Sequence, residues 1–227
     1  MVNHENKLDN PAWYSLSETH KKFNIDFANV KFYPPEYCQF GDSLTANDIL
    51  YSITQYSKLC HNFYIIGQKP NIPDGFKLEK EVESFQMIIN NKITLSVDEN
   101  IVELNAEYLE DVLELVAAGY PNFFQEKTLY LGKNFGIFKN KQLVAMTGER
   151  MKMNEFTEIS AVITHPNHTG NGYAKQLITH TVNQVFKENK TPYLHVAKTN
   201  NKAISLYKKL GFKIRREITF WGVAKTK

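Results

Sequence analysis

The sequence contains 227 residues, of which 42% are hydrophobic and 22% are charged, and its formal net charge at pH 7 is +3. These values are close to those of soluble globular proteins, so they argue against a disordered chain, a collagen-like chain and a disulfide scaffold. No run approaches the roughly 18 apolar residues of a membrane-spanning helix, and the polar beginning MVNHENKLDN predicts no secretory signal. Cys38 and Cys60 stand in no metal-binding spacing, so we expect free thiols in a reducing compartment, the cytoplasm.

Residues 1–95 predict a mixture of short helices and strands. The pair Asn10-Pro11 is typical of a helix start, because proline already has the backbone torsion of a first helical turn. The apolar runs at 63–67 and 84–89 predict strands. A second helix is predicted by apolar residues that recur at helical spacing, namely Ile49, Leu50, Ile53, Tyr56 and Leu59.

From about residue 100 the pattern becomes sharper. Helices are predicted after Asn105, at 173–187 and at 203–210. Strands are predicted, in chain order, at 101–104, 134–138, 143–153, 156–164, 193–197 and 212–220. This alternation of elements predicts an α/β domain.

Two glycines, Gly170 and Gly172, separate the strand at 156–164 from the helix that begins at Tyr173. The first N–H groups of a helix have no partner inside the helix, and the helix dipole is positive there. Glycine lets the backbone approach a ligand closely, so the loop suits a phosphate or a pyrophosphate. The dinucleotide fingerprint GxGxxG fails at Lys175, and no P-loop lysine follows the glycines, which favours a different phosphorylated cofactor. Taken alone, the loop could equally be a tight turn.

Two motifs resemble the acyl-CoA-binding core of the GNAT superfamily of N-acyltransferases. The first, Asn167-His168-Thr169-Gly170-Asn171-Gly172, resembles the loop Gln/Arg-x-x-Gly-x-Gly/Ala, with asparagine in the opening position. The second resembles Asn-x-x-Ala-x-x-Leu-Tyr-x-x-Leu-Gly-Phe and falls on Asn200, Ala203, Leu206, Tyr207, Leu210, Gly211 and Phe212. The segment GERMKMNEFTEISAVITHP also resembles the subgroup of glycine N-acyltransferases and their bacterial relatives.

The resemblance implies a mixed, mostly antiparallel sheet that is flanked by helices and opens between two parallel strands. Residues 1–95 would form a divergent α/β N-terminal half, and residues 100–227 the acetyltransferase domain. Acetyl-CoA is the implied co-substrate, and no metal is expected. The residues expected to contact acyl-CoA are Val162, Ile163, Thr164, His168, Thr169, Gly170, Asn171, Gly172, Tyr173, Ala174, Asn200, Ala203 and Tyr207.

Acyl transfer to an amine needs a proton acceptor for the amine and a proton donor for the departing thiolate. On the resemblance, Glu158 is the candidate base, and its place in the apolar strand FTEISAVIT predicts a raised pKa. The alternative is an outward-facing glutamate on a solvated face. Glu149 is the second candidate base, and it could instead pair with Arg150 or bind the acceptor. Tyr207 is the candidate acid, a role that is compatible with packing as a core aromatic.

The histidines give weaker signals. His165 and His168 lie three residues apart without acidic or cysteine partners at matching spacing, so they suit loop and cap roles better than a metal site. His195 could face the acceptor cleft or could be a core histidine with satisfied hydrogen bonds.

Charge is distributed unevenly along the chain. Residues 101–227 carry a net charge of +7 and residues 1–100 a net charge of −4, so the basic part suits an anionic partner. Its apolar residues follow core periodicity instead of alternating as exposed aromatics with basic residues, which favours acyl-CoA over nucleic acid.

The sequence therefore predicts an acyl-CoA-dependent N-acetyltransferase. The expected acceptor is a primary amine of a small molecule or an amino acid, acylated by direct transfer. We expect a monomer or a homodimer without a nucleic-acid or membrane partner. The alternative is a non-catalytic acyl-CoA-binding protein of the same fold.

Overall fold

The computed structural model describes residues 4–27, 29–45, 49–119 and 124–226. Its strands are β1 (Ile25–Phe27), β2 (Val30–Phe32), β3 (Phe40–Asp42), β4 (Asn62–Ile66), β5 (Phe76–Ile88), β6 (Ile101–Glu103), β7 (Asn134–Lys139), β8 (Gln142–Lys152), β9 (Phe156–Thr164), β10 (Thr191–Ala197) and β11 (Lys213–Lys225). Its α-helices are α1 (Pro11–Ser17), α2 (Leu50–Tyr56), α3 (Leu109–Gly119), α4 (Tyr173–Lys187) and α5 (Asn201–Lys209).

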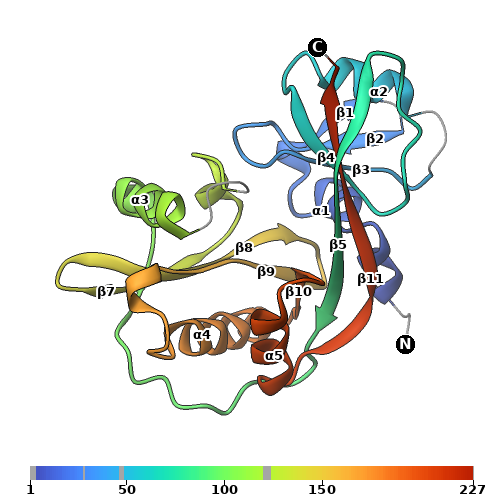
Figure 1. The fold of residues 1–227 in the computed structure, drawn as a ribbon. Coiled ribbons are helices and arrows are strands. Elements are labelled where there is room, and N and C mark those ends of the chain that lie inside the picture. Colours follow the sequence, from blue (N-terminus) through green and yellow to red (C-terminus); the bar gives the residue numbers. More distant parts are fainter. Residues whose placement is uncertain (1–3, 28, 46–48, 120–123, 227) are drawn as a thin grey trace.

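The strands form one mixed sheet with the order β1-β2-β3-β4-β11-β5-β10-β9-β8-β7-β6 (Figure 1). Among the described pairs, β3–β4 and β9–β10 are parallel and the others are antiparallel. The mixed, mostly antiparallel sheet flanked by helices is therefore confirmed. No helix in the described ranges has the length and apolar character needed to span a bilayer.

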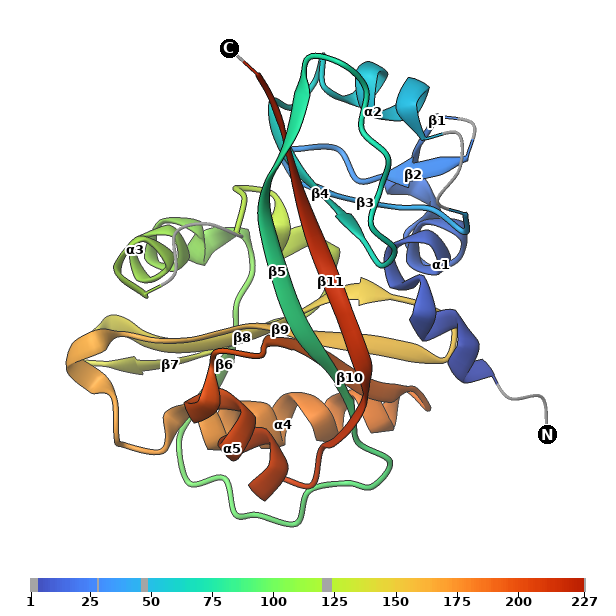
Figure 2. The same cartoon turned by 45° about the vertical axis from the view of Figure 1, so that its right-hand side comes forward.

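Helices cover both faces of the part of the sheet that contains β6 to β10. α4 and α5 lie on one face and α3 lies on the other (Figures 1 and 2). α4 has the bounds that its sequence predicts, and it buries the apolar residues that give it a 3.6-residue period: Leu177, Ile178, Val182 and Val185. Each such side chain contributes about 1.5–3 kcal/mol of transfer free energy, which fixes the helix on the sheet.

The long strand β5 joins the two halves of the chain. One edge pairs with β11 from Ile88 opposite Lys213 to Phe76 opposite Lys225, and the other edge pairs with β10. The sequence predicts only the segment 84–89, because residues 76–83 (FKLEKEVE) are rich in charge and give no apolar run. Residues 76–83 become part of β5 because they pair with β11, a segment far away in the sequence.

The sheet opens between β9 and β10. Their parallel ladder spans only Thr191 opposite Phe156 to Tyr193 opposite Glu158. Farther along β9, Ala161 has a φ of 49°, and the register with β8 shifts between Met146 and Gly148. Such an irregularity bends a strand, so β9 turns away from β10. The structure thus contains the opening that the sequence analysis predicts.

Candidate active site

A cavity of about 530 Å³ lies where β9 and β10 separate. One wall is made by residues 159–164 of β9 and the opposite wall by residues 195–197 of β10. Among the residues expected to contact acyl-CoA, those that line this cavity are Val162, Ile163, Thr164, Asn200 and Tyr207. The separation of the strands therefore brings residues of β9 and residues of the second sequence motif to one space.

The first part of the chain supplies a further wall. Phe40 of β3 and Val82 and Ser84 of β5 line the cavity, together with Phe220 of β11. The guanidinium carbon of Arg150 lies 4.7 Å from the centre of the Phe40 ring. An aromatic surface and a cation thus meet on the side of the cavity that the N-terminal half closes.

The glycine loop lies at the N-terminus of α4, outside the cavity lining. Gly170 has a φ of 88° and Gly172 a φ of 76°, a region in which side chains other than glycine are strained. A Cβ added to either glycine would meet no heavy atom within 4 Å, so the space in front of both is open. Gly172 is the N-cap of α4 and supplies no side-chain hydrogen bond. The first N–H groups of α4 therefore face a space that an anionic group could enter.

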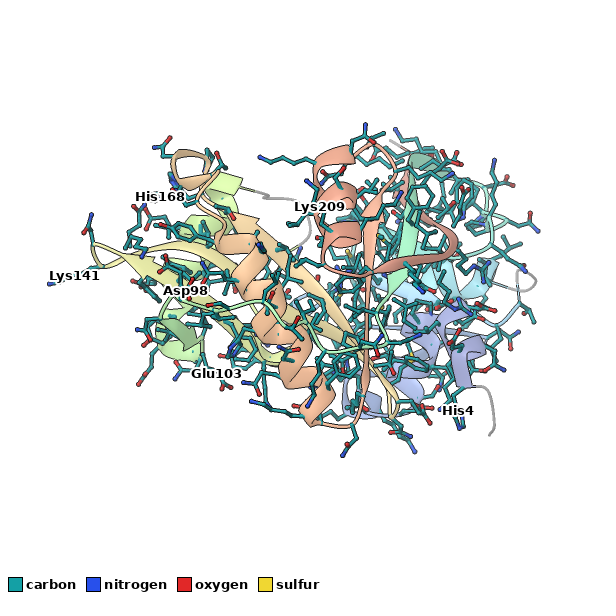
Figure 3. The ribbon with its side chains drawn as sticks, turned by 90° about the horizontal axis from the view of Figure 1, so that it is seen from below. His4, Asp98, Glu103, Lys141, His168 and Lys209 are labelled. Atoms are coloured by element: carbon teal, nitrogen blue, oxygen red, sulfur yellow. The ribbon has the colours of Figure 1, made fainter. Side chains whose placement is uncertain are left out.

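The other loop residues have mixed surroundings. Thr169 and Asn171 are exposed, and His168 and Ala174 are half-buried. Figure 3 labels His168 in the loop that leads into α4. Tyr173 is buried and packs with Leu177, so its ring belongs to the core. In the second motif, the Asn200 side chain accepts a hydrogen bond of 3.1 Å from the backbone N–H of Ala203 and caps α5. The three-residue spacing of Asn200 and Ala203 in that motif thus has a structural role at the helix start.

Glu158 is fully buried beside the cavity and has three polar neighbours. Arg150 donates to both carboxylate oxygens, from Nε at 2.8 Å and from Nη2 at 2.7 Å, and the backbone N–H of Met151 lies 3.4 Å away. His195 Nδ1 lies 2.8 Å from Oε1. Of these residues, Arg150 and His195 line the cavity directly.

The pKa of Glu158 differs from the sequence-based expectation. Burial by itself raises the pKa, but the charge and hydrogen bonds of Arg150, with the contact to His195, outweigh it and hold the pKa at about 2. The apolar strand predicts burial correctly and misses the buried cation, because a strand sequence does not show its cross-strand neighbours. Glu158 is therefore ionised throughout the neutral pH range.

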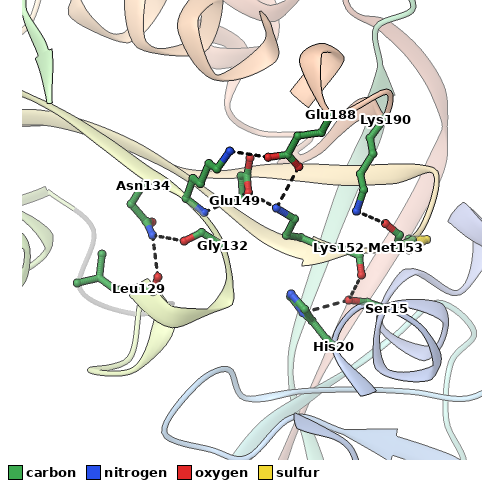
Figure 4. Close-up of polar contacts among 11 residues, drawn as sticks. Ser15, His20, Leu129, Gly132, Asn134, Glu149, Lys152, Met153, Glu188 and Lys190 are labelled. Atoms are coloured by element: carbon green, nitrogen blue, oxygen red, sulfur yellow. Dashed lines mark hydrogen bonds and ion pairs between the residues drawn. The ribbon is translucent and has the colours of Figure 1, made fainter. Parts of the chain in front are cut away.

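Glu149 lies in a different cluster. Its Oε2 accepts hydrogen bonds from Lys152 Nζ at 2.5 Å and from the backbone N–H of Lys133 at 3.1 Å, and Lys152 also lies near Glu188 (Figure 4). Glu149 is not among the residues that line the cavity. The alternative pairing of Glu149 with Arg150 is wrong: at the register shift between Glu149 and Lys152, Arg150 pairs with Glu158 and Glu149 pairs with Lys152.

Tyr207 lines the cavity from α5 and packs against Phe212, with ring centroids 5.8 Å apart. Burial raises the pKa of its hydroxyl to about 12. The side chain is a core aromatic and also a protonated phenol at the cavity, so its packing is compatible with the acid role, which stays a prediction.

The sequence analysis did not single out Arg150, Phe40 or Gln86 for the site. Regular pairing from Lys152 opposite Thr157 would place Met151 opposite Glu158, and the register shift between Glu149 and Lys152 brings Arg150 to Glu158 instead, so the sequence holds no local signal for this pair. No local signal exists either for Phe40 or for Gln86, whose strands reach the site only through the sheet order. Within the described ranges, no cluster of three or more His, Cys, Asp or Glu side chains could hold a metal ion.

Comparisons with known proteins agree with this architecture. Residues 134–221 match the family model described as FR47-like protein. An acetyltransferase of the GNAT family from Novosphingobium aromaticivorans superposes with a TM-score of 0.87 and 27% identity, over 97% of this chain and 99% of that chain. The fold is that of the GNAT acetyltransferases.

More distant GNAT structures share the fold over most of their length. A GCN5-related N-acetyltransferase from Kribbella flavida has 11% identity and a TM-score of 0.64, over 100% of this chain and 97% of that chain. A GCN5-related N-acetyltransferase-like protein from Streptococcus suis has 16% identity and a TM-score of 0.61, over 96% of both chains. None of the curated proteins compared with the chain matches it in sequence.

Proposed function

We propose that the protein transfers an acetyl or short acyl group from acyl-CoA to a primary amine of a small molecule or an amino acid. The observation that carries the proposal is the cavity between the separated strands β9 and β10, beside a glycine loop at the N-terminus of α4. The GNAT acetyltransferase fold supports acyl transfer in general. The preference for a small acceptor rests on the resemblance to the glycine N-acyltransferase subgroup.

The residues fit the phosphorylated donor in two places. The open space before Gly170 and Gly172 suits the pyrophosphate, which the first N–H groups of α4 would bind. Val162, Ile163 and Thr164 would line the path of the pantetheine arm. The donor supplies the thioester that is broken in the reaction.

The reaction exchanges a carbon–sulfur bond for a carbon–nitrogen bond. The amine nitrogen uses its lone pair to bind the carbonyl carbon, and the sulfur leaves with the electron pair of the broken bond. The nitrogen loses one proton and the sulfur gains one, so no proton is consumed overall when the amine enters uncharged. We propose that Tyr207 gives its hydroxyl proton to the sulfur and then takes up the proton that the nitrogen loses.

A non-catalytic acyl-CoA-binding protein is the second candidate. The specific observation in its favour is the low pKa of Glu158, because a carboxylate with a pKa of about 2 is a weak general base at neutral pH. The two functions predict the same affinity for acetyl-CoA and differ only in turnover.

Calorimetry with acetyl-CoA and a thiol-release assay with a panel of small primary amines separate the outcomes. We expect binding together with release of one free thiol for each amide formed. Binding without thiol release for every amine would favour the second candidate. Absence of binding would contradict both.

A further inference from the structure

A chain of polar side chains crosses the sheet behind the cavity. It runs through five neighbouring strands, β11, β5, β10, β9 and β8. The participants are Arg215, Gln86, His195, Glu158 and Arg150, in that order. The chain crosses the gap between β9 and β10 just where their ladder ends at Tyr193 and Glu158, so it connects the two strands that form the cavity.

The orientation of the Gln86 amide is fixed from outside the cavity. Gln86 is fully buried, and its Oε1 lies 2.9 Å from Arg215 Nη1, a group that can only donate. Its Nε2 lies 2.7 Å from the backbone oxygen of Leu8, which can only accept. Reversing the amide would break both hydrogen bonds, so Nε2 must be the atom that faces His195.

The position of the proton on His195 follows from its two neighbours. Gln86 Nε2 lies 3.0 Å from His195 Nε2 and can only donate, so this ring nitrogen must accept. On the other side, the ionised Glu158 can only accept, so Nδ1 must carry the hydrogen. Both ends of the ring therefore require the same form, the neutral Nδ1–H tautomer.

This arrangement occupies the lone pairs of Glu158 and of His195, the two groups of the polar chain that could take a proton from an amine. The two oxygens of Glu158 accept four hydrogen bonds, two from Arg150, one from His195 and one from the backbone of Met151. The lone pair of His195 Nε2 accepts the hydrogen bond from Gln86. An amine in the cavity therefore meets no unoccupied lone pair on either residue.

We infer that Gln86 is a positioning residue that holds His195 as the Nδ1–H tautomer, and that the acceptor amine consequently enters the cavity as its free base. The second half of this inference rests on the proposed function. When the amine enters uncharged, the nitrogen loses one proton and the sulfur gains one. The site therefore needs no side chain that keeps a proton. The substrate class is thus a primary amine that is substantially uncharged at the working pH.

The charged and titratable groups around His195 are consistent with a neutral ring. Glu158 faces it from β9, with its charge balanced by Arg150 from β8. On the β5 side the nearest cation, Arg215, is separated from the ring by Gln86 and paired with Asp9 at 2.7 Å. The rings of Tyr193 and Phe220 pack against it in T-shaped arrangements, at centroid distances of 5.6 Å and 5.2 Å.

The tautomer is tested by 15N NMR of the histidine side chains at neutral pH, which needs no activity. In the wild-type protein we expect a proton on Nδ1 of His195 and none on Nε2. Gln86→Glu places a carboxylate opposite Nε2, and we expect both ring nitrogens to carry a proton in that variant. A wild-type signal with a proton on Nε2 would overturn the inference whether or not the variant folds.

The control is a second glutamine–histidine pair outside the cavity. Gln184 Nε2 lies 3.3 Å from His180 Nε2 on α4, so Gln184→Glu makes the same chemical change away from His195. We expect this variant to leave the His195 signals and the kinetics unchanged. If both variants changed the His195 NMR signals equally, the added negative charge alone would explain the effect. That result would contradict a positioning role for Gln86.

The free-base requirement is tested by kinetics with the wild-type enzyme. For two small primary amines whose solution pKa values differ by about two units, the midpoints of the kcat/KM profiles should differ by a similar amount. In Gln86→Glu we expect an additional break at the same pH for both amines. A wild-type midpoint that is identical for both amines would contradict the inference, whereas no turnover with any amine would contradict the proposed function and leave the NMR result standing.

Discussion

At the scale of single residues, Glu158 is fully buried and yet negatively charged at neutral pH. The Arg150 pair makes this possible, since two charge-assisted hydrogen bonds offset the cost of removing the carboxylate from water. Because the pKa is lower in the folded than in the unfolded protein, the pair stabilises the fold at neutral pH. The two residues therefore contribute to stability as well as to the cavity.

Glu158→Gln tests this contribution. The stabilisation from Glu158 is complete above a pH of about 4.5, its ordinary pKa, and is lost as the pH falls toward about 2. We expect the variant to lose about 3–5 kcal/mol of unfolding free energy at pH 7, because Arg150 is left buried without its counter-charge. Denaturant titrations between pH 3 and pH 7, a range set by these pKa values, measure both effects. If the unfolding free energy changed equally with pH in the wild type and the variant, the low pKa of Glu158 in the folded protein would be contradicted.

The kinetics of Glu158→Gln address the base role that the family resemblance implies. Removal of a general base usually lowers kcat by roughly 10²–10⁴. Because the carboxylate oxygens of Glu158 already accept four hydrogen bonds, we expect a smaller loss in the folded variant, and a loss of that size would support the base role. The wild-type pH–rate profile should show no break from Glu158 above a pH of about 4. Full activity in a folded variant would remove Glu158 from the catalytic residues and leave Glu149 as the glutamate to test.

Tyr207→Phe separates chemistry from packing at a second position. The phenol has a pKa of about 12 and stays protonated at neutral pH, so it is able to donate to the departing sulfur. Free thiols have a pKa near 8.5, so the thiolate is already a fair leaving group and we expect a loss of only about 10- to 100-fold in kcat. Melting temperature and acetyl-CoA affinity should not change, since the ring stays. Tyr51→Phe, at an exposed tyrosine, is the control, and full activity of Tyr207→Phe would reduce Tyr207 to a core aromatic.

At the scale of elements, the loop and α4 act together. Gly172→Val adds a branched side chain in the space before the helix and strains a residue with a φ of 76°. We expect acetyl-CoA binding to weaken at least about tenfold, or about 1.4 kcal/mol, in calorimetry. Gly75→Val is a matched control, because Gly75 has a φ of 81° and equally open surroundings far along the chain from the loop. If the Gly172→Val variant and the wild type bound acetyl-CoA with equal affinity, this loop would not be the binding site of the CoA pyrophosphate.

At the scale of the whole molecule, residues 1–95 and residues 100–227 share one sheet. β5 lies between β10 and β11, and Arg215 of β11 is paired with Asp9 near the N-terminus. Removing β5 would expose the edges of two strands and one wall of the cavity. The division of the chain into two domains at about residue 95 remains a prediction, and this geometry indicates that the second part depends on the first.

Limited proteolysis tests that dependence. The exposed segment around residues 94–98 is a natural site of cleavage. We expect nicked chains to stay associated in gel filtration, because the β5–β10 and β5–β11 ladders hold the pieces together. A stable, active fragment that begins near residue 95 and elutes alone would contradict the prediction.

The sequence by itself determined the elements whose signals are local. The period of α4, the glycines before it and the spacing of the second motif all lie within short segments, so residues 156–164 and 173–187 were predicted with the bounds that the structure has. The same residues gave the resemblance from which the fold and the opened sheet followed. The apolar strand around Glu158 favoured burial over an outward-facing position, and the structure buries the side chain.

Only the tertiary structure decided the charge state and the neighbours of the site. The pKa of Glu158 depends on Arg150 across a hairpin and on His195 from a strand that lies 37 residues along the chain. Phe40 reaches the cavity, and Gln86 reaches His195 beside it, because β3 and β5 join a sheet whose order is unrelated to chain order. Electrostatic interactions act between atoms a few ångströms apart in space, and strand order, which local sequence patterns do not encode, sets which atoms those are.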